Sequence, residues 1–495
     1  MEHAVLAFDL GTGGVKAALF TTALPCRLLG EAFVSYPTFY PGPQLYEQRP
    51  QDWWNALVQA VQQLMKQQPV QVEGISSSGH SLGLVPMDHC GRLLLEQVPI
   101  WSDSRAGAQA DAFFASIPWE QWYETTGNGF KPGMYPLFKL MWYREHQPDL
   151  YRQTAAVLGT KDYVNFRLTG RMATDISYAS GSGCFDCRKL SYRRDFLETA
   201  GVDETLMPQV LPSGGTVGTL TEEAAALLGL TAGIPVFAGG VDNACTAMGA
   251  GCVGGGAPFL SLGSSAQITV SGPEPTVDVH SKPFVFVHGA EGEYLNAQAI
   301  CSAGTAWNWA RDQLCHEGER DYESMNRIAA QSPAGANGLV FYPDLAGGLA
   351  LGGEKLQGAF LGLELRHTRA DLLRAVLEGV AFGMRKCVED LRVAPDLPIR
   401  IAGGGAKNAM WMQIFADAME RTIIVEQMQQ ATAAYGAAAI ALKAMGHWES
   451  FDPLHAAEND VIIYKPRTDM RRAWRAWEAA ARAAARFGNE REEEL

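Results

Sequence analysis

The chain has 495 residues, of which 47% are apolar and 19% are charged. Because a single hydrophobic core rarely grows beyond about 250 to 300 residues, this length predicts two domains with separate cores. The formal net charge of -14 argues against binding to nucleic acid or to an anionic membrane, which requires clustered lysine and arginine. We therefore expect a small polar molecule as the partner.

The N-terminus and the cysteines bear on the compartment. The first residues lack the charged, apolar and small-residue order of a signal peptide, and no window approaches about 18 uninterrupted apolar residues. The nine cysteines are spread over the whole chain, which fits reduced thiols better than a disulfide framework. One local pair, Cys184 and Cys187, has no second pair or histidine at ligand spacing. The pattern favours a cytoplasmic protein and weighs against metal or redox chemistry at this pair.

The first predicted element is a β-hairpin over residues 6–20, in which two apolar runs flank a turn of threonine and glycines. Glycine permits a tight turn with exposed amide N–H groups, and a threonine hydroxyl adds a donor, so such a turn can bind a phosphate. The alternative is that the glycines only form a turn. The candidate residues are Asp9, at the end of the first strand, and Gly11, Thr12, Gly13 and Lys16 after it.

A core-facing helix and a strand over residues 70–75 are predicted next. The apolar residues of the helix recur at helical spacing and are Trp53, Leu57, Val61 and Leu64. The serine-rich residues 76–83 are predicted to form a polar loop after the strand, where α/β sheets bind ligands. His80 and Ser81 are therefore candidates for contacting substrate hydroxyl groups, with a satisfied loop histidine as the alternative.

Asp103 is a further candidate for binding a substrate. It follows an apolar stretch and precedes Arg105 by two residues. A carboxylate can accept two hydrogen bonds from a vicinal diol, which would orient a sugar. The alternative is a surface ion pair with Arg105, which would contribute little to stability. Helices are predicted around residues 106–116, 136–146 and 162–168.

Asp242 is the candidate general base. A β-rich run from residue 234 ends in two glycines, and Asp242 and Asn243, both candidates for contacting the substrate, then open an alanine-rich helix. A carboxylate on such a turn is held by a rigid element and can face a cleft, which suits a base. The alternative is a helix N-cap, a position that aspartate favours.

Two nucleotide-binding motifs are excluded. Residues 249–254 match the glycine pattern of a dinucleotide site, but they follow a helix rather than a strand. No GxxxxGK[ST] occurs, which excludes a P-loop. The glycine-rich residues 249–256 instead mark the predicted lobe boundary, with domains of residues 1–247 and 248–495.

A second hairpin over residues 258–270 repeats the design of the first, with Gly263 and Ser264 between two apolar strands. One such hairpin in each half of the chain suggests two related lobes that hold one polyphosphate from opposite sides. This arrangement resembles the superfamily of sugar kinases, actin and heat-shock chaperones.

Residues 399–408 read as a strand, a turn of three glycines and a helix N-cap. Such a turn allows a flat ring or a phosphate to approach the backbone closely. The candidate residues are Gly403, Gly404, Gly405 and Asn408. A long helix is predicted before this stretch, over residues 369–388, and an amphipathic one after it, over residues 469–487. We expect the last helix to dock on its own lobe rather than on a membrane.

Two stretches carry a family resemblance that covers nearly the whole chain. Residues 134–146 look like the first signature of the FGGY carbohydrate kinases, with Tyr143 where an aliphatic residue or phenylalanine is usual. Residues 358–363, followed by Asp371 and Glu378 at the expected distance, match the second signature. Within the family the chain is most similar to the xylulokinases, on the strength of Glu47-Gln48, Trp53-Trp54, Lys161-Asp162-Tyr163, Leu168-Thr169-Gly170 and Thr174-Asp175.

The resemblance implies two α/β lobes of ribonuclease-H-like fold flanking a central cleft that holds ATP and a sugar. It also implies that Asp9, with Gly11 and Thr12, handles Mg²⁺ and phosphate and that Asp242 is the catalytic base. Gly263 and Ser264 would form the second phosphate clamp, and the adenine pocket would be lined by Gly403, Gly404, Gly405 and Asn408. The expected reaction is phosphorylation of a ketopentose hydroxyl.

The sequence departs from xylulokinases at two places that bear on the substrate. Leu82 stands where those proteins carry a histidine, and residues 344–350 replace a Gly-Glu-Arg-Thr-Pro segment. A kinase for another polyol, an L-ketose or an aldonate is therefore the first alternative. An actin-like or chaperone-like ATPase and a sugar-binding regulator without catalysis are further alternatives. The sequence leaves the choice between monomer and homodimer open.

Overall fold

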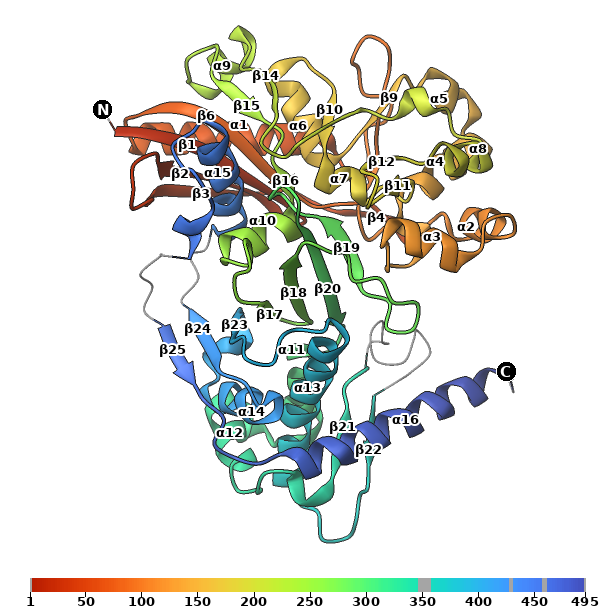
Figure 1. Cartoon of the computed structure of the whole chain (residues 1–495), viewed down its shortest axis with the longest axis vertical. Helices are drawn as coiled ribbons and strands as arrows, with labels where there is room; N and C mark the ends of the chain where they lie inside the picture. The colour runs from red at the N-terminus through yellow and green to blue at the C-terminus, as the bar shows by residue number, and fades with distance from the viewer. Residues whose placement is uncertain (1, 346–357, 427–430, 456–460, 494–495) are drawn as a thin grey trace.

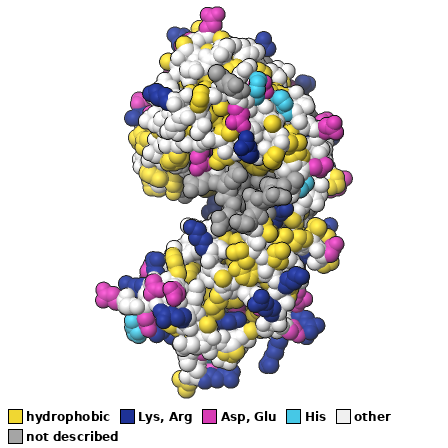
Figure 2. Space-filling view, turned by 90° about the vertical axis from the view of Figure 1, so that its left-hand side faces the viewer, with side chains coloured by type: hydrophobic (Ala, Val, Ile, Leu, Met, Phe, Trp, Pro, Cys, Tyr) yellow, Lys and Arg dark blue, Asp and Glu magenta, His cyan; other side chains and the backbone are white. Residues whose placement is uncertain are grey.

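The structure is a computed structural model that describes residues 2–345, 358–426, 431–455 and 461–493. Its elements form two α/β lobes (Figure 1), and the molecule narrows between them (Figure 2). The α/β fold with two lobes is the one predicted. None of the described helices combines the length and the apolar character that crossing a membrane would require. The cytoplasmic location and the boundary between residues 247 and 248 stay predictions.

The first lobe is built on a seven-stranded sheet with the order β14-β15-β6-β1-β2-β3, in which β16 also pairs with β6. Its strands are β1 (Glu2–Gly11), β2 (Gly14–Thr21), β3 (Leu28–Ser35), β6 (Val70–Gly79), β14 (Thr216–Thr219), β15 (Pro235–Phe237) and β16 (Gly240–Val241). The second lobe has a seven-stranded sheet with the order β19-β20-β18-β17-β23-β24-β25. Its strands are β17 (Phe259–Leu262), β18 (Ala266–Gly272), β19 (Phe284–Val287), β20 (Tyr294–Ile300), β23 (Ile399–Ala402), β24 (Ile423–Glu426) and β25 (Val461–Tyr464).

The two predicted hairpins occupy matching positions in the two sheets. In the first lobe β1 is antiparallel to β2 and parallel to β6, and in the second β17 is antiparallel to β18 and parallel to β23. The turns that follow β1 and β17 therefore emerge beside the carboxyl end of a parallel neighbour in each lobe. This is the edge of an α/β sheet at which ligands bind.

Shorter strands pair outside the two large sheets. They are β4 (Phe39–Gly42), β5 (Leu45–Gln48), β7 (Val85–Met87), β8 (Val98–Pro99), β9 (Ala156–Leu158), β10 (Ala173–Asp175), β11 (Phe185–Asp186), β12 (Ser191–Tyr192), β13 (Gln209–Leu211), β21 (Val340–Tyr342) and β22 (Ala359–Leu361). The strand predicted over residues 70–75 is longer than expected. Ser76 to Gly79, predicted as loop, continue β6, because their backbone pairs in register with β1.

The α-helices confirm the predicted segments with small shifts at their ends. They are α1 (Pro50–Gln67), α2 (Gly107–Phe114), α3 (Trp119–Thr126), α4 (Pro136–His146), α5 (Pro148–Gln153), α6 (Thr160–Thr169), α7 (Ile176–Ser180), α8 (Arg194–Ala200), α9 (Glu222–Leu228), α10 (Asp242–Gly249), α11 (Gly304–Leu314), α12 (Tyr322–Ala329), α13 (Arg369–Asp390), α14 (Ala409–Met419), α15 (Thr432–Ala444) and α16 (Arg471–Glu493). The last helix continues beyond residue 487, where the predicted helix ended, to Glu493.

One helix from the C-terminal half of the chain belongs to the core of the first lobe. Buried residues of α15 pack with Val5, Ala7 and Phe20 of the first sheet. Figure 1 shows α15, in blue, beside β1, β2 and β3, in red. The two lobes are therefore not simply the two halves of the chain.

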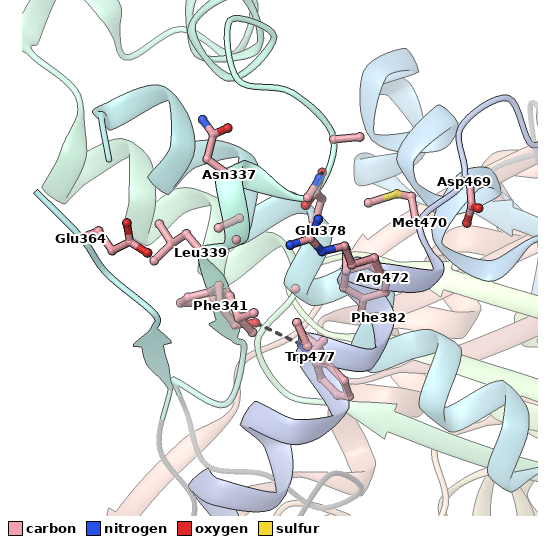
Figure 3. A pocket seen from close by; sticks show the side chains of 18 of the residues that line it. Asn337, Leu339, Phe341, Glu364, Glu378, Phe382, Asp469, Met470, Arg472 and Trp477 are labelled. Carbon is pink, nitrogen blue, oxygen red and sulfur yellow. Dashed lines mark hydrogen bonds between the residues drawn. The ribbon is translucent and has the colours of Figure 1, made fainter. Parts of the chain in front are cut away.

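The C-terminal helix α16 docks on the second lobe, as predicted. Met470, Trp474 and Trp477 are buried in the core of that lobe. The indole Nε1 of Trp477 donates a hydrogen bond to the carbonyl oxygen of Phe341 at 3.1 Å, as the dashed line in Figure 3 shows. Trp474 and Trp477 of the helix are thus covered by the second lobe.

All nine cysteines are free thiols, which confirms the prediction of a chain without a disulfide framework. Cys184 and Cys187 are both buried. Burial raises the pKa of both thiols, to about 12 and about 11. Neither thiol is therefore a reactive thiolate at neutral pH.

Candidate active site between two glycine-rich hairpins

Asp9 lies near the end of β1, opposite Lys16 on β2 and Ser78 on β6. The hydroxyl of Ser78 donates a hydrogen bond to Asp9 Oδ1 at 2.7 Å. Burial raises the pKa of Asp9, although this hydrogen bond and the charge of Lys16 act in the opposite direction. At the tip of the hairpin, the indole Nε1 of Trp101 donates to Thr12 Oγ1 at 3.0 Å. The first hairpin is thus fixed both beside its turn, at Asp9, and in the turn itself, at Thr12.

Asp242 is the first residue of α10 and follows β16, which pairs with the end of β6. Its Oδ1 accepts a hydrogen bond from the amide of Asn243 at 2.8 Å. The N-cap is Val241, so the alternative that Asp242 serves as the N-cap is wrong. The pKa of Asp242 rises to about 7, because burial and then the negative charge of Asp9 disfavour the ionised form. Asp242 and Asp9 thus interact at one site.

This pair of carboxyl groups suits a divalent cation. Mg²⁺ is commonly held through one or two carboxylates, with substrate phosphates and water as its other ligands. The charges of Asp9 and Asp242 repel each other, and a bound cation would relieve that repulsion. Among the described residues there is no cluster of three or more His, Cys, Asp and Glu side chains that could hold a metal ion by itself. The donor set therefore fits a cation that arrives with a polyphosphate.

A cavity of about 560 Å³ opens beside the second hairpin. Five of the predicted cofactor residues line it together: Gly263, Ser264, Gly404, Gly405 and Asn408. A Cβ atom built on Gly404 would meet no atom within 4 Å, so the backbone there is open to a ligand. Gly263 and Gly404 follow β17 and β23, which are parallel neighbours in the sheet. The structure thus assembles the second hairpin and the triple-glycine turn into one site.

Gly403 and Asn408 shape the triple-glycine turn that borders the cavity. Gly403 has a φ of 111°, which favours glycine, and a Cβ on it would lie 2.5 Å from the carbonyl oxygen of Leu262. Gly403 itself does not line the cavity, but it bends the chain that does. Asn408 caps α14 as predicted, since its Oδ1 accepts a hydrogen bond from the amide of Trp411 at 3.1 Å. Its Nδ2 donates to Asn326 Oδ1 at 2.9 Å.

Except for Lys407, the other residues that line this cavity carried no local signal in the sequence. They are Gly304, Trp307, Asn308, Tyr322, Asn326, Lys407 and Trp411. Most come from α11, α12 and α14, helices that only the fold brings to the turn. Lys407 alone could have been predicted from the sequence, because it stands between the three glycines and the predicted N-cap, Asn408.

On the first lobe, His80 and Ser81 follow the end of β6 and are both buried. The ring of His80 lies edge-on to that of Trp53, with 5.8 Å between the centroids. Neither ring nitrogen has a hydrogen-bond partner of good geometry among the described residues. Burial lowers the pKa of His80 to about 4, so the imidazole is neutral at pH 7. The contacts of His80 and Ser81 with a substrate stay predictions.

Asp103 is fully buried and already accepts hydrogen bonds from the protein. Its oxygens receive the amide of Tyr46, at 2.9 Å, and the guanidinium of Arg105, at 2.7 and 2.8 Å. Arg105 also pairs with Glu47. The ion pair with Arg105 therefore exists, but it is buried rather than on the surface. The predicted contact of Asp103 with a sugar stays a prediction beside this structural role.

Lys139, from the stretch that resembles the first FGGY signature, connects the loop after β6, at Leu82, with the loop after β8, at Ile100. It is fully buried, and its Nζ donates to the carbonyl oxygens of Leu82, at 2.9 Å, and Ile100, at 2.8 Å. Leu82 has a φ of 58°, a conformation that is costly for leucine. Sequence reasoning did not assign Lys139 a role, although its place in the signature was the available signal.

Asn243, the residue after Asp242, links α10 to the other lobe. Its Oδ1 accepts a hydrogen bond from Gln267 Nε2 at 3.1 Å, and Gln267 lies on β18 of the second sheet. The predicted substrate residue therefore also holds α10 to the second hairpin.

A second cavity, of about 590 Å³, lies between β21, α13 and the start of α16 (Figure 3). None of the predicted site residues line it. Several of its charged side chains have partners within the protein, as Glu364 has in Arg366 and Glu378 has in Arg374. The cavity between the second hairpin and the triple-glycine turn is thus the better candidate for a ligand.

Comparison with known proteins agrees with this geometry. Two family models match the chain, the N-terminal domain of the FGGY family of carbohydrate kinases over residues 4–249 and its C-terminal domain over residues 259–445. The chain is 31% identical over 454 residues to the xylulose kinase of Bacillus subtilis (strain 168), covering 90% of this chain and 89% of that relative. It is 25% identical over 488 residues to the gluconokinase of Bacillus licheniformis, covering 96% and 94%.

A solved structure gives the same result. The crystal structure of xylulose kinase from Rhodospirillum rubrum is 28% identical and superposes with a TM-score of 0.89, covering 98% of this chain and all of the other, 100%. The similarity extends over both lobes and both hairpins. The chain belongs to the FGGY family of carbohydrate kinases and is an ATP-dependent sugar kinase of the xylulokinase-like kind.

Proposed function

We propose that the protein transfers the γ-phosphoryl group of ATP to a hydroxyl group of a ketopentose such as xylulose, with Asp242 as the general base. The observation that carries this proposal is the environment of Asp242. Its carboxyl group opens a helix between two glycine-rich hairpins, interacts with Asp9 and has a pKa of about 7. A base is most effective when its pKa lies near the working pH.

The reaction needs one proton acceptor and stabilisation of charge. The sugar hydroxyl oxygen attacks the γ-phosphorus, its proton passes to the Asp242 carboxylate, and the bond to the β-phosphate oxygen breaks to release ADP. Charge spread over the phosphoryl oxygens is stabilised by positioned donors, which the amides of the two hairpin turns supply. Closure of the two lobes would exclude water, the competing acceptor.

The nucleotide is assigned to the cavity beside the second hairpin. Gly263 and Ser264 would contact its phosphates, and Gly404, Gly405 and Asn408 would line its base. On the first lobe, Gly11, Thr12, Gly13 and Lys16 would face the transferred phosphate. We infer that Mg²⁺ accompanies ATP and that Asp9 binds it; the cation would neutralise charge on the phosphates.

The proposed sugar follows from the relatives, and one residue of this chain, Leu82, differs from xylulokinases on the sugar side. Xylulose kinases are the relatives of highest identity reported above, which favours a ketopentose. The gluconokinase similarity favours an aldonate as the second candidate. Leu82, at the position of the xylulokinase histidine, removes a polar group from the sugar side. His80, Ser81, Asp103 and Asn243 are the side chains proposed to be near the sugar.

The test is ADP release with Mg-ATP against D-xylulose, L-xylulose, D-ribulose, xylitol, glycerol, gluconate and no sugar. Strong stimulation by one ketopentose supports the proposal. Stimulation by gluconate or a polyol alone keeps the family and replaces the substrate. Equal ADP release with and without every sugar would contradict sugar phosphorylation and support an ATPase.

Replacing Asp242 tests the base directly. Asp242→Asn should lower kcat by roughly 10² to 10⁴-fold, because the amide cannot accept the proton. Asp186→Asn is a matched control, since Asp186 is a buried first-lobe carboxylate that accepts hydrogen bonds from the backbone of Arg188 and Lys189. Near-normal turnover of folded Asp242→Asn protein would remove the assignment.

A further inference from the structure

A cluster of three charged residues is buried in the first lobe behind the turn that carries Asp242. Lys161, Asp162 and Asp175 are each at most 1% exposed. Lys161 Nζ lies 2.6 Å from Asp162 Oδ1 and 2.7 Å from Asp175 Oδ1. A buried ion pair seldom stabilises a fold more than apolar residues of similar volume would. The cluster therefore calls for an explanation other than stability.

The second oxygen of Asp175 leads from this cluster toward Asp242. Asp175 Oδ2 accepts hydrogen bonds from the hydroxyl groups of Ser177, at 2.5 Å, and Ser213, at 2.9 Å. A carboxylate is only an acceptor, so the Ser177 hydroxyl must donate its proton to Asp175. Its lone pairs are then directed at the amide of Val241, which donates to Ser177 Oγ at 2.9 Å. Val241 is the residue before Asp242.

The other end of the same turn is held by the same lysine. The carbonyl oxygen of Ala238 accepts hydrogen bonds from Lys161 Nζ and Asn165 Nδ2, each at 3.1 Å. Residues 238–241 are thus held at one end by Lys161 of the cluster and at the other by Ser177, which is hydrogen-bonded to Asp175 of the cluster. Between them the chain passes close to β6, since a Cβ on Gly239 would lie 1.8 Å from the carbonyl oxygen of Ser77.

We propose that Ser177, oriented by Asp175 and Lys161, is a positioning residue that fixes the backbone in front of Asp242 and so aims its carboxylate at the substrate hydroxyl. This inference rests on the proposed role of Asp242 as the base. Misplacing a reacting group by about 1 Å can cost a factor of about 10² in rate, so one hydrogen bond at Val241 is enough to matter. The buried charges serve to orient one hydroxyl group.

Ser213 provides a matched control for this role. Ser177 and Ser213 are both buried, and the hydroxyl group of each donates one hydrogen bond to the same oxygen of Asp175. Only Ser177 accepts a hydrogen bond from Val241. Both Ser177→Ala and Ser213→Ala should lower the melting temperature, Ser177→Ala by more, because it also leaves the buried Val241 amide without its acceptor. Ser177→Ala alone should lower kcat, by roughly 10- to 100-fold, with the KM for ATP within about twofold of wild type.

A double-mutant cycle separates positioning from general damage. If Ser177 acts through Asp242, then Ser177→Ala should leave the residual kcat of an Asp242→Asn enzyme unchanged. A further loss of the same size in that background would overturn the proposal. Equal kcat values for Ser177→Ala and Ser213→Ala would overturn it too.

An isosteric pair keeps the test decisive if Ser177→Ala does not fold. Ser177→Thr retains Oγ and Ser177→Val has the same shape without it, so kcat should be at least about 10-fold higher for the threonine variant. Equal values would contradict the role of the hydroxyl. The proposed function fails separately, since it would be removed by an Asp242→Asn enzyme with near-normal turnover whatever the serine variants do.

Discussion

The folded state holds the Asp242 carboxyl group in an environment that favours its protonated form. Its pKa rises from an ordinary 3.8 to about 7, first because of burial and then because of the charge of Asp9. The folded chain therefore binds this proton more tightly than the unfolded chain does. The contribution to stability is fully present below pH 3.8 and is lost as the pH rises toward and through about 7.

Asp242→Asn should consequently stabilise the protein in a pH-dependent manner. At pH 8 the variant should melt several degrees above wild type, because no charge is then buried, and the difference should shrink as the pH approaches 4. Melting curves over pH 4–8 without nucleotide or Mg²⁺ give the measurement. A difference that does not change with pH would contradict the raised pKa.

Asp371 is a control whose pKa is shifted in the opposite direction, so its substitution should change the stability in the opposite direction as well. Burial raises its pKa, but hydrogen bonds from Ser332, Thr368 and Asn337 outweigh that effect and hold it at about 2. The stability that this carboxylate contributes is present above its unfolded pKa and is lost as the pH falls toward 2. Asp371→Asn should therefore lower the melting temperature at pH 8.

At the scale of elements, the triple-glycine turn after β23 provides a direct test of the nucleotide site. A Cβ on Gly404 would project into open space, whereas one on Gly405 would lie 2.5 Å from the Leu262 side chain. A side chain at Gly404 would thus occupy the cavity without disturbing the fold. The cavity is where we place the nucleotide, so this position separates binding from stability.

Gly404→Val should raise the KM for ATP by about 10-fold, the effect of losing about 1.4 kcal/mol of binding, with an unchanged melting temperature. The KM for the sugar should stay near its wild-type value. Gly107→Ala is the control, since its Cβ also meets no atom within 4 Å but lies on α2. An unchanged KM for ATP in the Gly404→Val enzyme would move the nucleotide to another site.

The elements with strong local patterns could be predicted from the sequence. Both hairpins, α4 and α13 formed where apolar spacing and glycine turns placed them. Of the residues that line the cavity, only those in and directly after the glycine turns could be predicted. Trp307 and Tyr322 reach the cavity from helices whose apolar pattern is ordinary and gives no sign of a binding site. Ser76 to Gly79 of β6 were misread as loop. The hydroxyl groups of Ser77 and Ser78 donate to the carbonyl oxygen of Ala238 and to Asp9 inside the lobe, but serines look like surface residues in a sequence.

The buried charges were harder to interpret than the apolar core. Lys161 and Asp175 were noticed only for their resemblance to xylulokinases, and nothing in their spacing revealed that they form an ion pair. Asp103 and Arg105 are close in sequence, so their pairing was foreseen, but their burial depends on Tyr46 and Glu47 from another segment. Contacts of this kind follow from the tertiary fold alone.

At the scale of the whole molecule, α10 and α15 join the two lobes. A Cβ on Gly436 of α15 would lie 1.9 Å from the carbonyl oxygen of Cys245, and one on Gly249 would lie 2.1 Å from that of Thr432. The two helices therefore cross in backbone contact. Since α15 also packs on Val5 of the first sheet, the first lobe is completed only by residues far along the chain.

This arrangement predicts how fragments of the protein behave. A chain of residues 1–247 lacks α15, which leaves apolar side chains of the first sheet, such as Val5 and Phe20, uncovered. We expect that fragment to bind a hydrophobic dye and to unfold without cooperativity. A second chain would join residues 1–252 through a short glycine-serine linker to residues 431–448, which contain α15. Because Gly249 contacts Thr432, this chain should regain the missing helix and a cooperative thermal transition. A cooperative transition for the 1–247 fragment alone would show that the first lobe folds without α15 and would support residue 247 as its boundary.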